Sequence, residues 1–221
     1  EDVWAVQKSA YNSASIEKSI LKRGFDGRWR YFTSYVAPED GRWCTTINRA
    51  DSVESLDPAN TQRLFTATDF DLEGVKDPWL IDVNGTYHLF LSVAINTAST
   101  NDSSHESLDI FNTGECKSAT ALATSTDLDN WDWQGIVLKP EGDTAWDKYC
   151  RRINSVLPLA GKYYAFYDGS EGHHQNYEER TGLAVSNDLR NWEILTPDAR
   201  RLWRLLSQPS HLSVSAPAAP R

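Results

Sequence analysis

The chain has 221 residues, 40% of them hydrophobic, and its 31 acidic against 22 basic side chains give a formal net charge of −9. This length suits one compact domain with a sizeable core. The acidic balance disfavours nucleic acid as a partner, and no stretch approaches the roughly 18 apolar residues that a membrane span needs. We therefore expect a soluble protein without a nucleic-acid or membrane partner, while its compartment and oligomeric state stay open.

Three segments of the chain, residues 18–36, 77–94 and 154–169, follow one plan. Each runs from a polar residue through Ser or Pro, a large apolar residue and Leu to a turn that contains Gly, and then into alternating aromatic residues. The turns are Asp26-Gly27, Asn84-Gly85 and Ala160-Gly161. Such turns favour tight hairpins, and the flanking β-branched and aromatic residues favour strands. Each segment is therefore predicted to be a β-hairpin.

A second repeat follows each hairpin, at residues 41–57, 119–135 and 181–197. Each copy gives a short apolar strand and a polar turn. The last two copies share a Ser-x-Asp-Leu-x-Asn-Trp element, whose Trp we expect to hold the outer strands of one sheet together. Two hairpins make a four-stranded antiparallel sheet, and its recurrence about every 60 to 75 residues is typical of propeller blades. The predicted fold class is all-β, a β-propeller of four-stranded antiparallel blades.

The motifs resemble those of the five-bladed β-propeller glycoside hydrolases of families 43 and 32. The resemblance rests on Lys-Asp-Pro at residues 76–78, on Asn-Gly-x-Tyr at residues 84–87, and on the two copies of the Trp element, and it covers roughly residues 12–197. It implies a carbohydrate substrate bound in a central pocket. About three of five blades can be counted, so we expect an incomplete propeller in residues 1–198. Residues 199–221 are expected to be an off-pattern tail, disordered or weakly helical.

Hydrolysis of a glycosidic bond needs two carboxyl groups that face one bond. The resemblance implies that Asp77 lies on an innermost strand and points into the pocket. It also implies a catalytic role for Glu17, as the acid or as the base or nucleophile, and Glu179 is the further candidate. Pro78 favours an extended conformation at Asp77, and strand alternation then turns Lys76 to the opposite face as an ion-pair partner.

Substrate-binding candidates come from the same alignment and from the loop after the third hairpin. Aligning the repeats on their Leu makes Lys18, Asp77 and Asn154 equivalent. Trp79 is expected to share the face of Asp77, and Arg180 could hold a carboxylate or a sugar hydroxyl. The neighbouring Arg151 and Arg152 with His173 and His174 form a potential anion site. The candidates are Lys18, Trp79, Arg152, Asn154, Asp168, His173 and Arg180.

Two functional interpretations stay open. The first is a glycoside hydrolase, or less favoured a glycoside phosphorylase. The second is a sugar-binding or interaction propeller without catalysis, or an inactive enzyme fragment, and Asn154 favours it by standing where a carboxylate could be. The sequence has neither the spacing of a metal site nor a glycine-rich phosphate loop, so no metal or cofactor is predicted.

Overall fold

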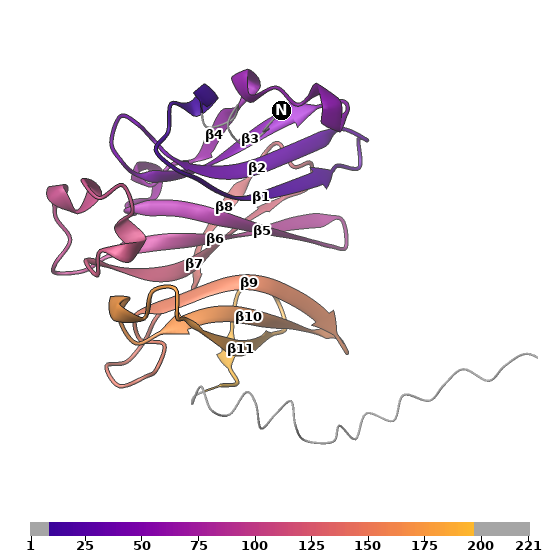
Figure 1. The fold of residues 1–221 in the computed structure, drawn as a ribbon. Coiled ribbons are helices and arrows are strands. Elements are labelled where there is room, and N and C mark those ends of the chain that lie inside the picture. Colours follow the sequence, from indigo (N-terminus) through magenta and orange to yellow (C-terminus); the bar gives the residue numbers. More distant parts are fainter. Residues whose placement is uncertain (1–8, 197–221) are drawn as a thin grey trace, which may run out of the picture.

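The computed structural model describes residues 9–196, which form three four-stranded antiparallel units (Figure 1). We call them the first, second and third sheet, although the second and third are joined into one eight-stranded sheet. The first sheet contains β1 (Ile16–Arg23), β2 (Trp29–Val36), β3 (Trp43–Ala50) and β4 (Gln62–Phe65). The second contains β5 (Gly74–Val83), β6 (Thr86–Asn96), β7 (Cys116–Ser125) and β8 (Asp132–Leu138). The third contains β9 (Cys150–Leu159), β10 (Lys162–Ser170), β11 (Arg180–Ser186) and β12 (Glu193–Ile194). A single parallel bridge, between Ser118 and Cys150, joins the second sheet to the third.

Short 3₁₀ helices occupy the connections between strands. They are η1 (Val53–Ser55), η2 (Pro58–Asn60), η3 (Thr68–Phe70), η4 (Asp102–His105), η5 (Ile110–Asn112) and η6 (His173–Gln175). The loop between β6 and β7 carries η4 and η5, and the loop between β10 and β11 carries η6. Both loops lie at the same end of the molecule (Figure 1).

The three predicted hairpins are confirmed. Their turn glycines, Gly27, Gly85 and Gly161, have φ of 82°, 79° and 76°. Asn84 and Ala160, the residues before two of them, also have positive φ, 52° and 50°. Positive φ at both central residues matches the twist of two-residue hairpins, which explains the Asn-Gly signal in the sequence.

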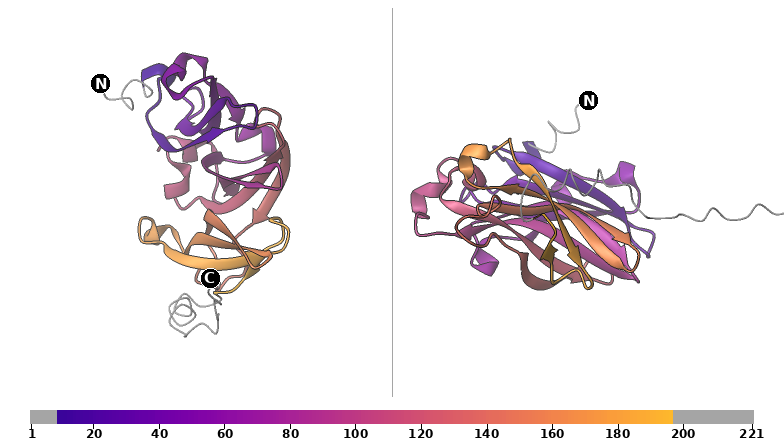
Figure 2. Two further views of the ribbon diagram at one scale, coloured as in Figure 1. Left: turned by 90° about the vertical axis from the view of Figure 1, so that its right-hand side faces the viewer. Right: turned by 90° about the horizontal axis from the view of Figure 1, so that it is seen from below.

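The sheets pack face to face, one behind the next (Figure 2). The first core cluster joins Phe32 and Ile47 of the first sheet to Leu89 of the second, all at most 1% exposed. The second cluster joins Phe90 of the second sheet to Tyr167 of the third, both fully buried. Successive twisted sheets with cores between their faces form a β-propeller, as the repeats predicted.

The repeated Trp element connects neighbouring sheets, which corrects the expectation that its Trp holds the outer strands of one sheet. Trp131, in the turn between β7 and β8, packs edge-on against Phe32 of the preceding sheet, with ring centroids 5.9 Å apart. Trp192, in the equivalent turn of the third sheet, packs against Phe90, again in the preceding sheet, at 6.1 Å. Each copy of the element therefore locks its blade to the one before it.

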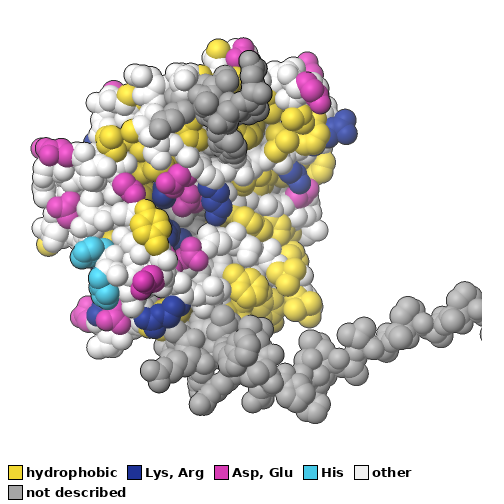
Figure 3. All heavy atoms as spheres, in the orientation of Figure 1, with side chains coloured by type: hydrophobic (Ala, Val, Ile, Leu, Met, Phe, Trp, Pro, Cys, Tyr) yellow, Lys and Arg dark blue, Asp and Glu magenta, His cyan; other side chains and the backbone are white. Residues whose placement is uncertain are grey.

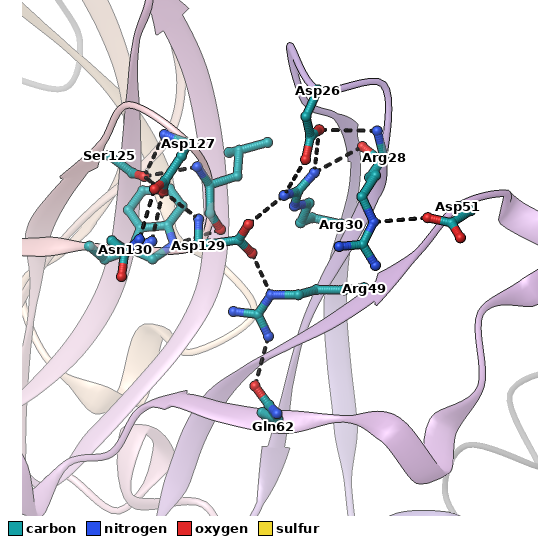
Figure 4. Close-up of polar contacts among 12 residues, drawn as sticks. Asp26, Arg28, Arg30, Arg49, Asp51, Gln62, Ser125, Asp127, Asp129 and Asn130 are labelled. Carbon is teal, nitrogen blue, oxygen red and sulfur yellow. Dashed lines mark hydrogen bonds and ion pairs between the residues drawn. The ribbon is translucent and has the colours of Figure 1, made fainter.

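Ion pairs reinforce the contact of Trp131 with the first sheet (Figure 4). Asp129, in the same turn as Trp131, accepts a hydrogen bond of 2.5 Å from Arg30 of β2 and another from Arg49 of β3. Arg30 also binds Asp26 at 2.6 Å, and its side chain is only 1% exposed. The buried guanidinium is thus neutralised from both sides, as burial of a charge requires.

Two expectations from the sequence remain, one about the C-terminal tail and one about membrane-spanning segments. The tail at residues 199–221 lies outside the described residues. Within residues 9–196, no helix is long and apolar enough to cross a membrane.

Candidate functional site

The innermost strands β1, β5 and β9 each carry a β-bulge in their first half. In β1 the register skips Lys18, in β5 it skips Asp77 and Pro78, and in β9 it skips Asn154. The alignment of Lys18, Asp77 and Asn154 is thus confirmed by backbone geometry. A bulge bends its strand and redirects a side chain, and such bulges are over-represented next to active sites. Figure 3 shows acidic and basic side chains gathered on this face. We call the charged side chains around these three bulges the charged cluster; they are Glu17, Lys18, Lys76, Asp77, Arg152 and Glu179.

The backbone at Asp77 is left-handed, with φ of 56°, so the expectation of an extended conformation is wrong. Pro78 disfavours the helical region at the preceding residue, but here tertiary contacts decide. The Asp77 N–H donates a hydrogen bond of 3.1 Å to Ser34 Oγ on β2 of the first sheet. A left-handed non-glycine residue costs free energy and persists only when its surroundings fix it. The backbone of Asp77, and with it the direction in which the side chain leaves the strand, is therefore fixed.

Lys76 lies at the centre of the charged cluster. Its ammonium is 2.5 Å from Glu17 Oε2 and 4.0 Å from Asp77 Oδ2, so its expected role as an ion-pair partner is confirmed. The expectation that it faces away from Asp77 is wrong, because the bulge breaks the alternation of side chains. The ammonium also lies 4.6 Å from the ring centroid of Trp43 and 5.0 Å from that of Phe111. Cation–π contacts of this kind favour a charge that burial would otherwise penalise.

Lys18 and Asn154 bridge the first and third sheets. The Lys18 ammonium donates a hydrogen bond of 3.3 Å to Asn154 Oδ1. The Lys18 side chain is exposed to water, yet the protein around its ammonium partly desolvates that group and lowers its pKa. The carboxylates of Asp77 and Asp168 raise the same pKa, but their effect is smaller. A hydrogen bond thus joins the bulges of β1 and β9 directly.

Arg152 and Glu179 form the third charged contact of the cluster. Arg152 Nη2 donates to Glu179 Oε1 at 2.7 Å, and both side chains are less than one-fifth exposed. Although burial alone lowers it, the pKa of the Arg152 guanidinium is raised by nearby Cys150 and by the carboxylates of Asp77, Glu179 and Asp168. The cation that binds the Glu179 carboxylate is thus Arg152 and not Arg180, while the expected contact of Arg180 with a sugar hydroxyl stays a prediction.

Other candidates lie apart from the bulges. Arg180 stacks over the Trp146 ring, with its guanidinium carbon 6.0 Å from the centroid. Trp79 lies beyond the bulge of β5 and packs against the Phe90 ring at 6.1 Å, so strand alternation no longer relates its side chain to that of Asp77. Arg151 pairs at 2.9 Å with Asp147, a residue 1% exposed, so it is not available for the expected anion site.

His173 lies in the loop between β10 and β11, against the loop between β6 and β7. A Cβ added to Gly114 would come within 2.7 Å of His173 Nδ1, so the two loops touch at this point. Among the described residues, no group of three or more His, Cys, Asp or Glu is placed to hold a metal ion.

Sequence reasoning missed two residues that shape the cluster. Ser34, whose hydroxyl accepts from Asp77, lies mid-strand and has no local signature. Phe111, which contacts Lys76, lies beside Ile110, and this buried apolar pair in an otherwise polar loop was a usable signal.

Comparison with known proteins gives the following similarities. A scan against protein-family models finds no match, and a search of curated proteins finds none either. Among solved structures, the chain is similar to a family 117 glycoside hydrolase from the marine bacterium Zobellia galactanivorans, with a TM-score of 0.58 and 15% identity over 84% of this chain and 57% of that one. It is similar to sucrose-6-phosphate hydrolase from Lactobacillus gasseri, with a TM-score of 0.57 and 13% identity over 86% and 38%. It is also similar to a family 32 β-fructofuranosidase from Bombyx mori, with a TM-score of 0.55 and 17% identity over 81% and 34%.

The chain thus spans between about a third and three fifths of the length of these structures. At such identities the likeness concerns the backbone and not the identity of individual side chains. The fold is therefore that of the β-propeller glycoside hydrolases, represented by three blades in residues 9–196.

Proposed function

We propose that this protein binds a carbohydrate at the charged cluster and hydrolyses a glycosidic bond there. The observation that carries the proposal is the convergence of Glu17 and Asp77, from two neighbouring inner strands, on the ammonium of Lys76. Laid end to end, the two distances to Lys76 keep the carboxylates closer than the roughly 9.5 Å that is the upper separation in glycosidases. The hydrolases that share this fold support the same reaction class.

In this proposal Asp77 is the central carboxylate and Glu17 works with it. Asp77 is fixed by its bulge, and its side chain is 17% exposed, so it offers a defined negative charge to a developing oxocarbenium ion. Glu17 is 41% exposed and can reach a leaving-group oxygen or a water molecule. Glu179, fixed by Arg152, is better suited to hold sugar hydroxyls through that pair.

Asp77→Asn tests the hydrolase proposal. The substitution keeps the size and polarity of the side chain and removes its charge. In protein first shown to cleave a member of an aryl-glycoside panel, we expect kcat to fall at least about 100-fold with the fold intact. Asp82→Asn, the same change further along β5, is the matched control and should retain activity. Undiminished turnover in Asp77→Asn would return that residue to a structural role.

One observation favours a second function, carbohydrate binding without hydrolysis. Two of the three equivalent bulge positions carry Lys18 and Asn154, which bind each other and provide no carboxylate. In addition, Glu17 and Glu179 each have a cationic partner. Retention of the wild-type protein by a polysaccharide, without release of reducing sugar, would support this function over hydrolysis.

A further inference from the structure

An aromatic side chain stands exposed in the loop between β10 and β11. Tyr177 is 87% exposed, the largest value among the exposed large hydrophobic side chains of residues 9–196. Its φ is 66°, in the left-handed region that costs an aromatic residue free energy. A single exposed aromatic residue is ordinary, but one displayed by a strained backbone needs an explanation.

The ring is anchored at its far end. Asn112, in the loop between β6 and β7, donates a hydrogen bond of 3.2 Å from Nδ2 to the Tyr177 hydroxyl. Asn112 Nδ2 also binds Asp109 Oδ2, which fixes the amide in turn. The tyrosine hydroxyl is therefore tied to a loop of the second sheet, while the ring stays open to solvent.

The chain neighbours of this contact place it at the rim of the charged cluster. Asn112 follows Phe111, whose ring packs over the Lys76 ammonium. Tyr177 precedes by two residues Glu179, which binds Arg152. Isolated hydrophobic surface stands among the acidic and basic side chains of this face in Figure 3.

We propose that Tyr177 forms a sugar-stacking subsite at the rim of the charged cluster, with Asn112 as its positioning residue. This inference rests on the proposed function and names how a bound carbohydrate chain is held. The C–H face of a sugar ring is apolar and packs on an aromatic face, while its hydroxyls reach polar side chains. A ring held rigid before binding loses little conformational entropy when the sugar arrives, so anchoring by Asn112 strengthens binding.

The test measures retardation of the protein in native gels that contain inulin, arabinan, xylan or polygalacturonate, and the dissociation constant on the polysaccharide that retards wild type. Tyr177→Ala removes the ring and should weaken binding about fivefold to tenfold. Tyr177→Phe and Asn112→Ala each break the anchor and should weaken it about twofold to threefold, with no further loss when combined. Phe25→Ala, which removes an exposed ring from the turn between β1 and β2, is the matched control and should bind as wild type.

The outcomes separate this inference from the proposed function. If Tyr177→Ala binds as tightly as wild type, the stacking subsite is wrong while the proposed function stands. Additive losses in the double variant would overturn the positioning role of Asn112. If wild type is retarded by none of the four polysaccharides and cleaves no aryl glycoside, both the proposed function and the subsite are wrong. Equal melting temperatures of the variants show that the fold is unchanged.

Discussion

Lys18 donates a hydrogen bond of 3.3 Å to Asn154, and these two residues occupy the bulge positions of β1 and β9 that correspond to Asp77 on β5. Only one of the three equivalent positions therefore supplies a carboxylate. For a reaction that needs two, the candidates for the second carboxylate that we consider within residues 9–196 are Glu17 and Glu179, which lie beside the bulges.

Substitution by Gln separates the two candidates. Glu17→Gln should lower kcat at least about 100-fold, because it removes a carboxylate that faces Asp77 across Lys76. Glu179→Gln should raise KM with less than about a tenfold change in kcat, because it weakens the ion pair with Arg152 that we propose holds sugar hydroxyls. Steady-state kinetics on the same aryl glycoside measure both. The reverse pattern would assign the catalytic role to Glu179.

Lys76→Met separates the function of the ammonium from the packing of its stem. Methionine keeps a flexible apolar chain between the rings of Trp43 and Phe111, so the free energy of unfolding should change by less than about 1.5 kcal/mol. Activity or polysaccharide binding should fall at least about tenfold, because Glu17 loses the charge that orients it. Lys22→Met is the control. Lys22 lies on β1, the strand of Glu17, and its ammonium is 5.6 Å from the centroid of the Tyr87 ring. A large loss of stability without a specific loss of function would make Lys76 a purely structural residue.

The sequence predicted the repeating parts of this molecule because their causes are local. Gly85 and Gly161 mark turns that require positive φ, and alternating aromatic residues mark half-buried strands. The equivalence of Lys18 and Asn154 followed from the repeat alone. Such features recur in every blade, so each copy supports the reading of the others.

The contacts that build the charged cluster have no local cause. The left-handed backbone at Asp77 depends on Ser34, 43 residues away, and it overrides the preference that Pro78 imposes on its neighbour. Glu17 meets Lys76 across 59 residues. A one-residue bulge then reverses which side chains share a face, so period-two reasoning about Trp79 fails at the position where function is expected.

Arg30→Met should strongly destabilise the contact between the first two sheets. It removes a buried guanidinium and leaves the carboxylates of Asp26 and Asp129, which are 44% and 32% exposed, without their partner. Since both carboxylates reach water, the expected loss is about 2–3 kcal/mol, below the range for fully buried pairs. Arg28→Met, which breaks an exposed pair with Asp51, should cost less than about 1 kcal/mol. Equal losses in urea denaturation would show that burial of Arg30 does not matter.

Stability should fall as the pH drops below about 4, because carboxylates of the structural turns are held ionised in the folded state. Hydrogen bonds from Arg30 lower the pKa of Asp26 to about 2. The backbone N–H groups of Asn130 and Asn191 likewise lower the pKa of Asp127 and Asp188. A group with a depressed folded pKa stabilises the protein above its unfolded pKa of about 3.9, and this contribution is lost as the pH falls through the folded value.

The double variant Asp127→Asn, Asp188→Asn tests this dependence, because both residues occupy the same turn in successive blades. Urea denaturation between pH 6 and pH 2 should show the variant less stable than wild type at pH 6. The two curves should approach each other as the pH falls from about 4 toward 2, because these carboxylates bind protons in the unfolded wild-type chain over that range while they stay ionised in the folded state. Asp51→Asn removes an exposed carboxylate of the first sheet, and its curve should run parallel to that of wild type. A constant gap between double variant and wild type at every pH would mean that these turns stabilise the blades through packing alone, and that ionisation of Asp127 and Asp188 contributes nothing.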